Sequence, residues 1–307
     1  MAEFRCLPGR RVAHRLPQFL AARHAASTQR RYISAWSAYR RWCAASHLPT
    51  RSVDTVVLFI MCRALAKVKA TTLRADVNAI QTFCPAAIDA DPRLVSQALE
   101  AARKLSAPPK AKYPITWALL GRIYRHLRRS ATSTWRRDWA FFLLGFIGFF
   151  RAQELASLRW SDLDFSDPRG VIIKLRQSKT DRFGSGAQVL LAHGTRHRFC
   201  PVQALAHLPQ QSPFVFPGPN NHQSISTSTM RTRLRSTLSD ILPRRQARHY
   251  SLHSLRRGGA TAAAQLRVPL RLIKSHGRWR SDTVQLYTLA LPDELWGVST
   301  ALQRAAP

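Results

Sequence analysis

The sequence predicts a mainly helical protein of two domains, the second of which also holds a small β-sheet. Apolar residues recur at helical spacing from about residue 13 to residue 105, and a proline-rich stretch at 106–114 then breaks the pattern. Two β-rich segments follow at 170–177 and 187–192. A chain of 307 residues is also long for one core and about right for two. We therefore expect domains at 1–105 and 115–307, joined by a linker.

The first domain is predicted to be a small helical module. Its first helix lies in "STQRRYISAWSAYRRWC", where Ser27 or Thr28 can serve as the N-cap. The apolar positions of this helix are Tyr32, Trp36, Tyr39 and Cys43. Among them stand four arginines, Arg30, Arg31, Arg40 and Arg41. Further helical segments are expected at 53–65, 71–84 and 91–105. The last of these opens with Asp91 as cap and Pro92 at the first helical position.

The linker "SAPPKAKYP" contains three prolines and two lysines in nine residues, a composition typical of an extended, polar and semi-rigid connection. The second domain begins with a helix at 116–127 and a long apolar run at 139–150. A β-hairpin is then predicted, with the turn in "SKTDRFGSG" and Lys179 near its tip. Beyond it, a helix begins at Pro201, and a capped helix in "SISTSTMRTRLRSTLSDIL" follows. The latter directs Leu234, Leu238 and Ile241 inward and carries Arg231 and Arg235 on another face.

The charge of the chain points to a polyanionic partner. Lys and Arg number 48 against 16 Asp and Glu, which gives a formal net charge of +32. Such an excess destabilises a compact monomer unless a polyanion neutralises it. Nucleic acid fits best, because arginine binds phosphate oxygens in a bidentate manner and each neutralised phosphate releases a counterion. A membrane surface fits less well, since no segment joins a basic face to an apolar one.

Export and membrane insertion are not expected. The N-terminal stretch lacks a continuous apolar region of the secretory type. The apolar run at 139–150 has twelve residues, whereas a membrane-spanning helix needs about 20, so we expect a core helix there. The five scattered cysteines include no C-x-x-C pair and fit buried thiols in a reducing compartment. We expect an intracellular protein associated with DNA, in the nucleus if the host is eukaryotic.

Four stretches, in chain order, carry residues suited to one reaction. They are "FFRAQELASLRWSDL" with Arg151, "RQSKTD" with Lys179, "HSLRRGGAT" with His253 and Arg256, and "LIKSHGRWRSDTVQLY" ending in Tyr287. No one of these motifs is specific alone. Their order resembles the tyrosine recombinase (phage integrase) family, whose catalytic set is an arginine, a hairpin lysine, a His-x-x-Arg, a second His or Trp, and a tyrosine. The forms "HSLRRGGAT" and "GRWRSD" look most similar to integrases of eukaryotic mobile elements.

The resemblance implies a helical core-binding domain followed by a mixed α/β catalytic domain of the DNA breaking-rejoining fold. It also implies a site-specific recombinase that cleaves and rejoins double-stranded DNA through a 3′-phosphotyrosine intermediate, with four protomers in one synaptic complex. A type IB topoisomerase or resolvase is the alternative activity. A DNA-binding derivative without activity is a further alternative.

The chemistry of the residues agrees with these roles. Arg151 and Arg256 can offset the charge on a pentacoordinate phosphate, and Glu154 is suited to orient an arginine. Lys179, or else Lys174, can protonate the leaving 5′ oxygen. A tyrosine hydroxyl with a pKa near 10 is a poor nucleophile at neutral pH, so His253 would accept its proton or position the phosphate. Weaker candidates for the nucleophile are Tyr113, Tyr124 and Tyr250. No cofactor is expected, because the covalent intermediate conserves the bond energy.

The sequence departs from the family at the second histidine. Many members have a Gly-His pair nine residues before the nucleophile, where this chain has Arg278, with Trp279 next to it. An indole N–H can donate to a phosphate oxygen, so we assign the role to Trp279 and keep Arg278 and His276 as alternatives.

The sequence offers two further kinds of candidate site, a metal site and a DNA-binding surface. A metal site is disfavoured, because the sets around His193, His197 and Cys200, and at His249 and His253, lack a fourth ligand and are crowded by arginines. The expected DNA-binding residues are Arg30, Arg31, Arg40, Arg41, Arg231, Arg235, Arg257 and Arg278.

Overall fold

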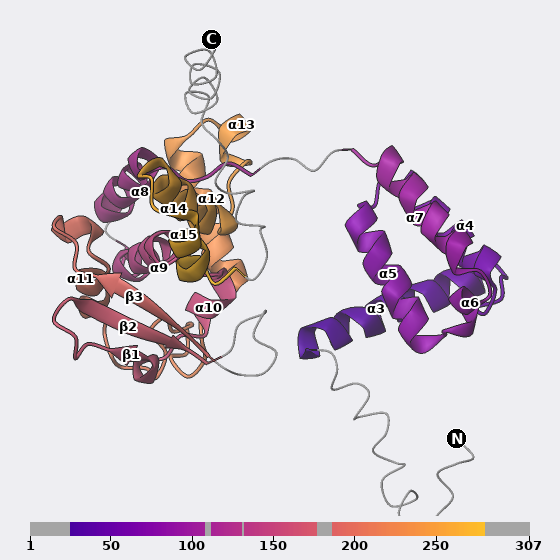
Figure 1. Cartoon of the computed structure of the whole chain (residues 1–307), viewed down its shortest axis with the longest axis horizontal. Coiled ribbons are helices and arrows are strands. Elements are labelled where there is room, and N and C mark those ends of the chain that lie inside the picture. The colour runs from indigo at the N-terminus through magenta and orange to yellow at the C-terminus, as the bar shows by residue number, and fades with distance from the viewer. Residues whose placement is uncertain (1–24, 108–111, 131, 177–185, 280–307) are drawn as a thin grey trace, which may run out of the picture. The chain divides into compact units, whose positions relative to one another are not determined.

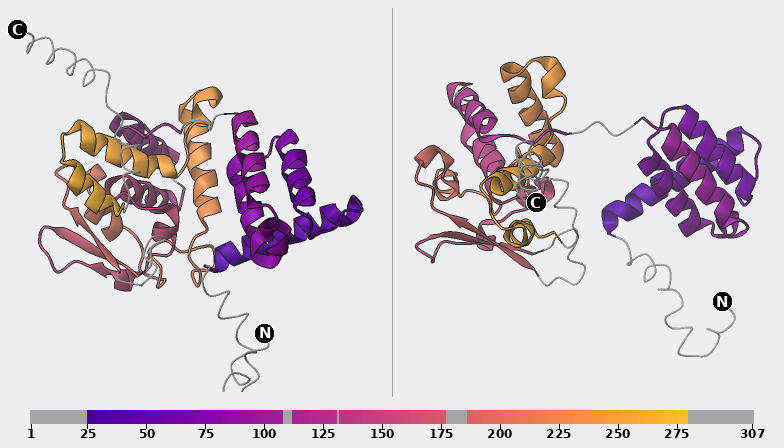
Figure 2. Two further views of the ribbon diagram at one scale, coloured as in Figure 1. Left: turned by 45° about the vertical axis from the view of Figure 1, so that its right-hand side comes forward. Right: turned by 45° about the horizontal axis from the view of Figure 1, so that its top comes forward.

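The computed structural model describes residues 25–107, 112–130, 132–176 and 186–279 (Figure 1). The chain divides into two compact units, one ending at residue 109 and the other beginning at residue 110. Helices make up most of both units, and a three-stranded sheet lies in the second (Figure 2). The predicted fold class, mainly helical with a small sheet, is therefore confirmed.

The first unit is built from helices. They are α3 (Ala26–Ala45), α4 (Val53–Leu65), α5 (Ala70–Phe83), the short α6 (Ala86–Asp89) and α7 (Pro92–Leu105). Helix α3 packs on α5, and α4 packs on α7. Their apolar faces meet in one core, in which the rings of Tyr39 and Phe59 lie 5.1 Å apart, edge to face. The Tyr39 hydroxyl donates to the Thr50 carbonyl at 3.2 Å, and burial raises the pKa of Tyr39.

The caps of two helices in this unit can be compared with expectation. The Asp91 side chain accepts a hydrogen bond from the Leu94 amide at 2.9 Å, so the predicted cap of α7 is confirmed. The prediction that Ser27 or Thr28 caps α3 is wrong. The backbone leaves its extended conformation already after Ala25, whose carbonyl accepts from the amides of Thr28 and Gln29, so both hydroxyl residues lie inside the first turn.

The second unit is organised around one buried helix, α9 (Trp135–Ile147), which holds most of the predicted apolar run. Every residue of α9 from Asp138 to Phe146 is buried. It is surrounded by α8 (Trp117–Ser130), α11 (Pro201–Ala206) and α14 (His253–Gln265). The run at 139–150 is thus a core helix and its continuation, as predicted. Among the described residues, no helix is long and apolar enough to cross a membrane.

The sheet is antiparallel and has the order β1 (Leu163–Asp164), β2 (Gly170–Leu175), β3 (Ala187–Ala192). In the β2–β3 hairpin, Val171 pairs with Leu191 and Leu175 with Ala187. The buried side chains alternate along both strands and belong to the same core as α9. The predicted hairpin is confirmed, but Lys179 at its tip lies outside the described residues.

The remaining helices are α10 (Ala152–Ala156), α12 (Thr227–Ile241), α13 (Arg244–Ala247) and α15 (Leu270–Gly277). On α12, Leu234 and Leu238 are buried and Ile241 is half-buried, as predicted. Helix α14 approaches the core closely through Gly258 and Gly259. A Cβ atom at these positions would lie 2.0 Å from the Ile115 carbonyl oxygen and 1.9 Å from that of Phe146. Glycine is required there because any side chain would push α14 off the backbone beneath it.

The segment just before α8 is tied to the second unit. The Tyr113 amide donates to the His249 carbonyl at 3.0 Å, and the Ile115 amide donates to Ser254 at 3.0 Å. The Arg257 guanidinium donates to the Lys112 carbonyl at 2.7 Å. Part of the predicted linker at 106–114 therefore packs with the second unit.

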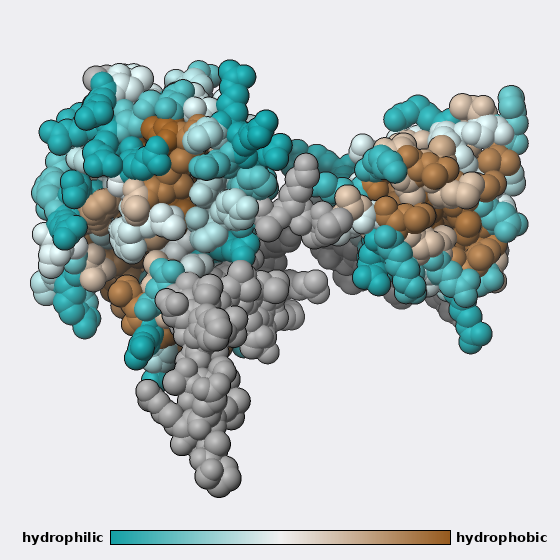
Figure 3. All heavy atoms as spheres, turned by 90° about the horizontal axis from the view of Figure 1, so that it is seen from above, coloured by the Kyte–Doolittle hydropathy of each residue, from teal (hydrophilic) through white to brown (hydrophobic). Residues whose placement is uncertain are grey.

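Figure 3 shows one face of each unit by hydropathy. Hydrophilic residues cover most of the visible face of the second unit, whereas apolar residues spread over much of the visible face of the first. Three large apolar side chains of α4, Leu58, Met61 and Leu65, are exposed in the first unit.

Candidate active site

Arg151 and Glu154 form the first part of the site, at the start of α10. Arg151 occupies the N-cap directly after the apolar run. The Glu154 carboxylate accepts from the Arg151 backbone amide at 2.9 Å and from its guanidinium at 2.6 Å. The Glu154 side chain is 4% exposed, while that of Arg151 is 24% exposed. Glu154 thus holds Arg151 in place and leaves one side of its guanidinium accessible.

Arg278 brings a second guanidinium to the same carboxylate. It follows α15, and its backbone has a left-handed φ of 58°. Its Nη2 lies 3.1 Å from Glu154 Oε2, and its side chain is 8% exposed. It also donates to the carbonyls of His276 at 2.8 Å, Phe149 at 3.0 Å and Gly148 at 3.3 Å. Arg278 therefore ties the end of α15 to the end of α9 and the start of α10.

The electrostatics of this cluster favour an ionised Glu154. Burial raises its pKa, but Arg278 and the hydrogen bonds from Arg151 outweigh burial, so the pKa of Glu154 is lowered. Burial in turn lowers the pKa of Arg278, and Glu154 opposes that change. Because a guanidinium stays protonated in proteins, the cluster contains two cations and one anion.

Arg256 lies deep beside this cluster, on α14. Arg256 is 1% exposed, and its guanidinium donates to the carbonyls of Phe149 and of Gly277, the latter at 2.6 Å. The same guanidinium lies 4.2 Å from the centroid of the Trp279 ring. Carbonyl oxygens and an aromatic face thus hold Arg256 in one orientation.

Two histidines lie nearby. His253 is the first residue of α14 and is exposed. Desolvation lowers its pKa, and the charges of Arg256, Arg151 and Arg257 act in the same direction. His276 instead donates through Nε2 to the Ile147 carbonyl at 2.9 Å, and burial lowers its pKa. His253 is therefore the neutral imidazole that remains accessible, while His276 is used in packing.

The structure brings together four of the predicted catalytic residues, Arg151, His253, Arg256 and Trp279. Arg256 donates to the Phe149 carbonyl just after α9, and its guanidinium lies on the Trp279 ring. The charges of Arg256 and Arg151 both act on His253. Lys179 and Tyr287 lie outside the described residues. The alternative lysine, Lys174, is exposed on β2 and lies 3.7 Å from Asp164.

The predicted DNA-binding arginines fall into two groups. Arg30, Arg31, Arg40 and Arg41 on α3, and Arg231 and Arg235 on α12, are exposed. Arg257 donates to the chain before α8, and Arg278 is buried on Glu154. The last two guanidinium groups are thus already engaged within the protein.

Sequence reasoning missed the part played by the backbone of residues 147–149. Their carbonyls accept from His276, Arg256 and Arg278, and Phe149 has a left-handed φ of 48°. A signal was present, because a helix that ends in a fully apolar stretch leaves its last carbonyls without polar neighbours along the chain. The partners, however, come from more than 100 residues further on.

The residues weighed as metal ligands do not gather into a metal centre. Cys200 Sγ lies 3.9 Å from His193 Nδ1, and the His249 ring stacks on Tyr113 at 4.9 Å. Within the described parts of the chain, no group of three or more histidine, cysteine or acidic side chains could hold a metal ion.

Comparisons with known proteins agree with this arrangement. The model of the phage integrase family matches residues 119–293. An integrase/recombinase xerD homolog of Selenomonas ruminantium is 29% identical, with 83% of this chain and 79% of that protein covered. The likeness to integrases of eukaryotic mobile elements stays a prediction.

Solved structures show the same fold. The Tn1549 transposon integrase in complex with transposon right end DNA has a TM-score of 0.59 at 14% identity, covering 82% of this chain and 85% of that one. A lambda integrase dimer bound to a COC′ core site has a TM-score of 0.59 at 16% identity, covering 90% and 75%. The chain therefore belongs to the phage integrase family, the tyrosine-type site-specific DNA recombinases.

Proposed function

We propose that this recombinase cleaves and rejoins double-stranded DNA through a covalent bond between Tyr287 and a 3′ phosphate. The observation that carries the proposal is the cluster at the end of α9, in which Glu154 and backbone carbonyls hold Arg151 and Arg256 beside His253. Rigidly held cations are what a transition state with growing phosphate charge requires.

In the proposed step, the Tyr287 oxygen attacks the phosphorus and the bond from phosphorus to the 5′ oxygen breaks. His253 takes the phenolic proton, and Lys179 gives a proton to the leaving 5′ oxygen. The reverse attack by a 5′ hydroxyl rejoins the strand and releases Tyr287. The lowered pKa of His253 keeps its imidazole neutral at neutral pH, which supports a role as proton acceptor.

Arg151 and Arg256 would share the phosphate charge. Arg151 has the more accessible guanidinium, whereas Arg256 is almost completely buried. The proposed contact of Arg256 with phosphate therefore requires the groups that cover it to move when DNA binds. Trp279 lies against Arg256 and is proposed to act with it, while Arg278 is proposed to act through Glu154 rather than on the phosphate.

Duplex DNA is the proposed partner. The solved structures named above are complexes with DNA, and the exposed arginines of α3 and α12 can contact phosphates without reading sequence. We further propose that four protomers act in one synaptic complex, as the family resemblance implies. The proposed place of action is on cellular DNA, in the nucleus if the host is eukaryotic.

Covalent trapping tests the proposed chemistry. A nicked suicide substrate should yield a protein–DNA adduct with the wild-type chain and none with Tyr287→Phe. A matched control is Tyr113→Phe, because Tyr113 is an exposed tyrosine before α8 and should leave the adduct yield unchanged. An adduct that persists in Tyr287→Phe and disappears in a different tyrosine variant would identify that other tyrosine as the nucleophile.

The alternative activities give different results. A topoisomerase would relax supercoiled DNA as a monomer and give no recombinant product from a two-site plasmid. A DNA-binding derivative without activity would give neither relaxation nor an adduct. Recombinant product together with a tetrameric complex on paired sites is the expected outcome.

A further inference from the structure

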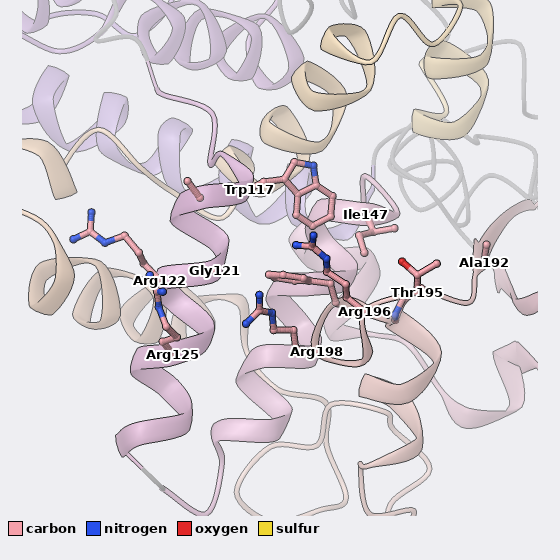
Figure 4. Close-up of a pocket in the computed structure, with 13 residues that line it drawn as sticks. Trp117, Gly121, Arg122, Arg125, Ile147, Ala192, Thr195, Arg196 and Arg198 are labelled. Carbon is pink, nitrogen blue, oxygen red and sulfur yellow. The ribbon is translucent and has the colours of Figure 1, made fainter.

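A pocket of about 780 Å³ lies in the second unit, apart from the residues assigned to catalysis. One wall is α8, with Trp117, Gly121, Arg122 and Arg125. The other wall is the segment after β3, with Thr195, Arg196, Arg198 and Phe199 (Figure 4). Its volume falls in the range of about 300–1,000 Å³ that is usual for ligand sites.

The pocket is strongly cationic. Four arginines line it, Arg122, Arg125, Arg196 and Arg198, and none of its described lining residues is a carboxylate. Within the described parts of the chain, none of the four forms an ion pair, although Arg122 donates to the Ile241 carbonyl. Four cations without an anion repel one another, so an anionic occupant would be stabilised here.

The pocket also presents a flat aromatic surface. Trp117 is 43% exposed, although it is large and apolar. Its ring is held edge to face by Phe146 at 4.6 Å and by Phe199 at 5.5 Å. A fixed, accessible indole beside cations suits a planar ring that carries a negative group.

A second pocket, of about 330 Å³, adjoins the first and shares Arg198 with it. It repeats the same combination, with Tyr124 and Trp135 as aromatic residues and Arg128 and Arg136 as cations. The Arg136 guanidinium lies 4.9 Å from the Trp135 ring centroid. The two pockets together, here called the α8 groove, thus combine rings and cations from α8, from the start of α9 and from the segment after β3.

We propose that the α8 groove binds a single strand of nucleic acid, with bases against Trp117 and Trp135 and phosphates on the arginines. Aromatic rings beside cations suit the bases and the phosphates of an unpaired strand. In a duplex the bases are stacked on one another, so a side chain reaches a base face only at the cost of unstacking. This site goes beyond the proposed recombination reaction and does not depend on Tyr287.

Binding of a labelled oligothymidine of about eight nucleotides to the full chain tests the proposal. Fluorescence anisotropy is measured with an excess of unlabelled duplex, which occupies duplex-binding surfaces. Arg125→Ala/Arg196→Ala should raise Kd about tenfold or more. The matched control is Arg129→Ala/Arg244→Ala, which removes two exposed arginines that line neither pocket and should change Kd less than about twofold.

The role of Trp117 is tested separately. Trp117→Ala should raise Kd about tenfold, whereas Trp117→Phe keeps a stacking surface and should restore most of the affinity. Circular dichroism checks that the Trp117 variants fold. If Trp117→Ala does not fold, the paired arginine variant and its control decide the question. Deoxyadenosine monophosphate serves as a second probe, and binding weaker than that of the oligonucleotide is expected because it can fill one pocket only.

Three outcomes would overturn the proposal. In the first, the paired arginine variant and its control bind the oligonucleotide equally. In the second, the mononucleotide binds as tightly as the oligonucleotide, which would make the groove a site for free nucleotides. In the third, no binding of the oligonucleotide remains in the presence of excess duplex. Adduct formation by Tyr287 is measured in the same variants, so failure of this site and failure of the proposed reaction are distinguished.

Discussion

Both units bury carboxylates against arginine, and the pKa values of Asp76 and Glu154 shift in opposite directions. In the first unit, Asp76 on α5 lies 3.2 Å from Arg63 of α4, and burial raises the pKa of Asp76 despite Arg63 and Arg31. In the second unit, Glu154 is buried more deeply, yet its pKa is lowered. Depth of burial alone therefore does not decide the charge state.

Glu154 receives more donors than Asp76, and one of them is a backbone amide. Glu154 receives the Arg151 amide and the guanidinium groups of both Arg151 and Arg278. Asp76 has one close arginine, which is itself about a third exposed to water. The donors to Glu154 outweigh its desolvation. Two arginines do not achieve this at Asp138 in the same unit, because burial raises the pKa of Asp138 although Arg137 and Arg233 both donate to it. Glu154 thus belongs to an ion cluster that holds Arg151 and Arg278 in position, whereas Asp76 forms an ordinary buried ion pair.

The largest expected effect is that of Glu154→Gln. It leaves the buried Arg278 and the partly exposed Arg151 without an anion and should lower the free energy of unfolding of the second unit by about 3–5 kcal/mol, with loss of covalent adduct. Asp76→Asn is the matched change in the first unit and should cost less than about 1 kcal/mol, because the charged form of Asp76 is already disfavoured. Urea unfolding of both variants checks this. Equal losses of stability in the two variants would show that Glu154 and Asp76 stabilise their units to the same extent.

A smaller effect is expected at Arg278. Arg278→Ala removes the link between α15 and Glu154 and should reduce the rate of adduct formation by about 100-fold, since Arg151 loses a fixed carboxylate. Arg278→Lys keeps the charge but not the forked contacts with three carbonyls, and should recover only part of the rate. A role in packing alone would leave the rate per folded molecule unchanged. Single-turnover rates at matched folded fractions distinguish the two.

Acid titration should act on the two carboxylates with opposite sign. The lowered pKa of Glu154 means that its contribution to stability is complete above the unfolded value of about 4.3 and is lost as pH falls through the folded pKa. The raised pKa of Asp76 means that its contribution is present below the unfolded value of about 3.9 and is lost as pH rises through the folded pKa. Carbon-detected NMR titration of the side chains measures both values. Shifts in the same direction would contradict the comparison.

The smallest expected effect belongs to Arg31, which acts on Asp76 at longer range. Arg31→Ala should change stability by less than about 0.5 kcal/mol and raise the pKa of Asp76 further, because one nearby positive charge is lost. If Arg31 contacts a phosphate, the slope of log K against log salt for duplex DNA should also fall by about 0.9. The control for charge removal in the same unit is Arg74→Ala, which removes an exposed arginine of α5.

Periodicity predicted most of the helices and the hairpin, because these elements are fixed by local apolar patterns. The run at 139–150 and the strands at β2 and β3 needed no distant information. The predicted cap of α3 was wrong, because a hydroxyl residue near the start of a helix can lie either at the N-cap or inside the first turn. Local signals identify elements better than their ends.

The sequence predicted which residues belong to the candidate site better than it predicted the contacts that hold them in place. The order of motifs indicated Arg151, His253 and Arg256, and Glu154 was expected to orient an arginine. The position of Arg278 could not be predicted, because its inward course depends on a left-handed backbone and on a carboxylate 124 residues away. Arginine at that position is equally compatible, in sequence, with a surface contact to phosphate.

The carboxyl end of α9 gives the enzyme a fixed reference point. The carbonyls at the end of α9 and just after it accept hydrogen bonds from Arg256, Arg278 and His276. A substitution that rotates or shortens the final turn of α9 should therefore misalign the reaction centre while the fold survives. Residues 144–149 are then expected to tolerate far less variation than equally buried positions near Trp139, and heating should abolish strand transfer before the unit melts. In this chain the register of an apolar helix is itself a determinant of activity.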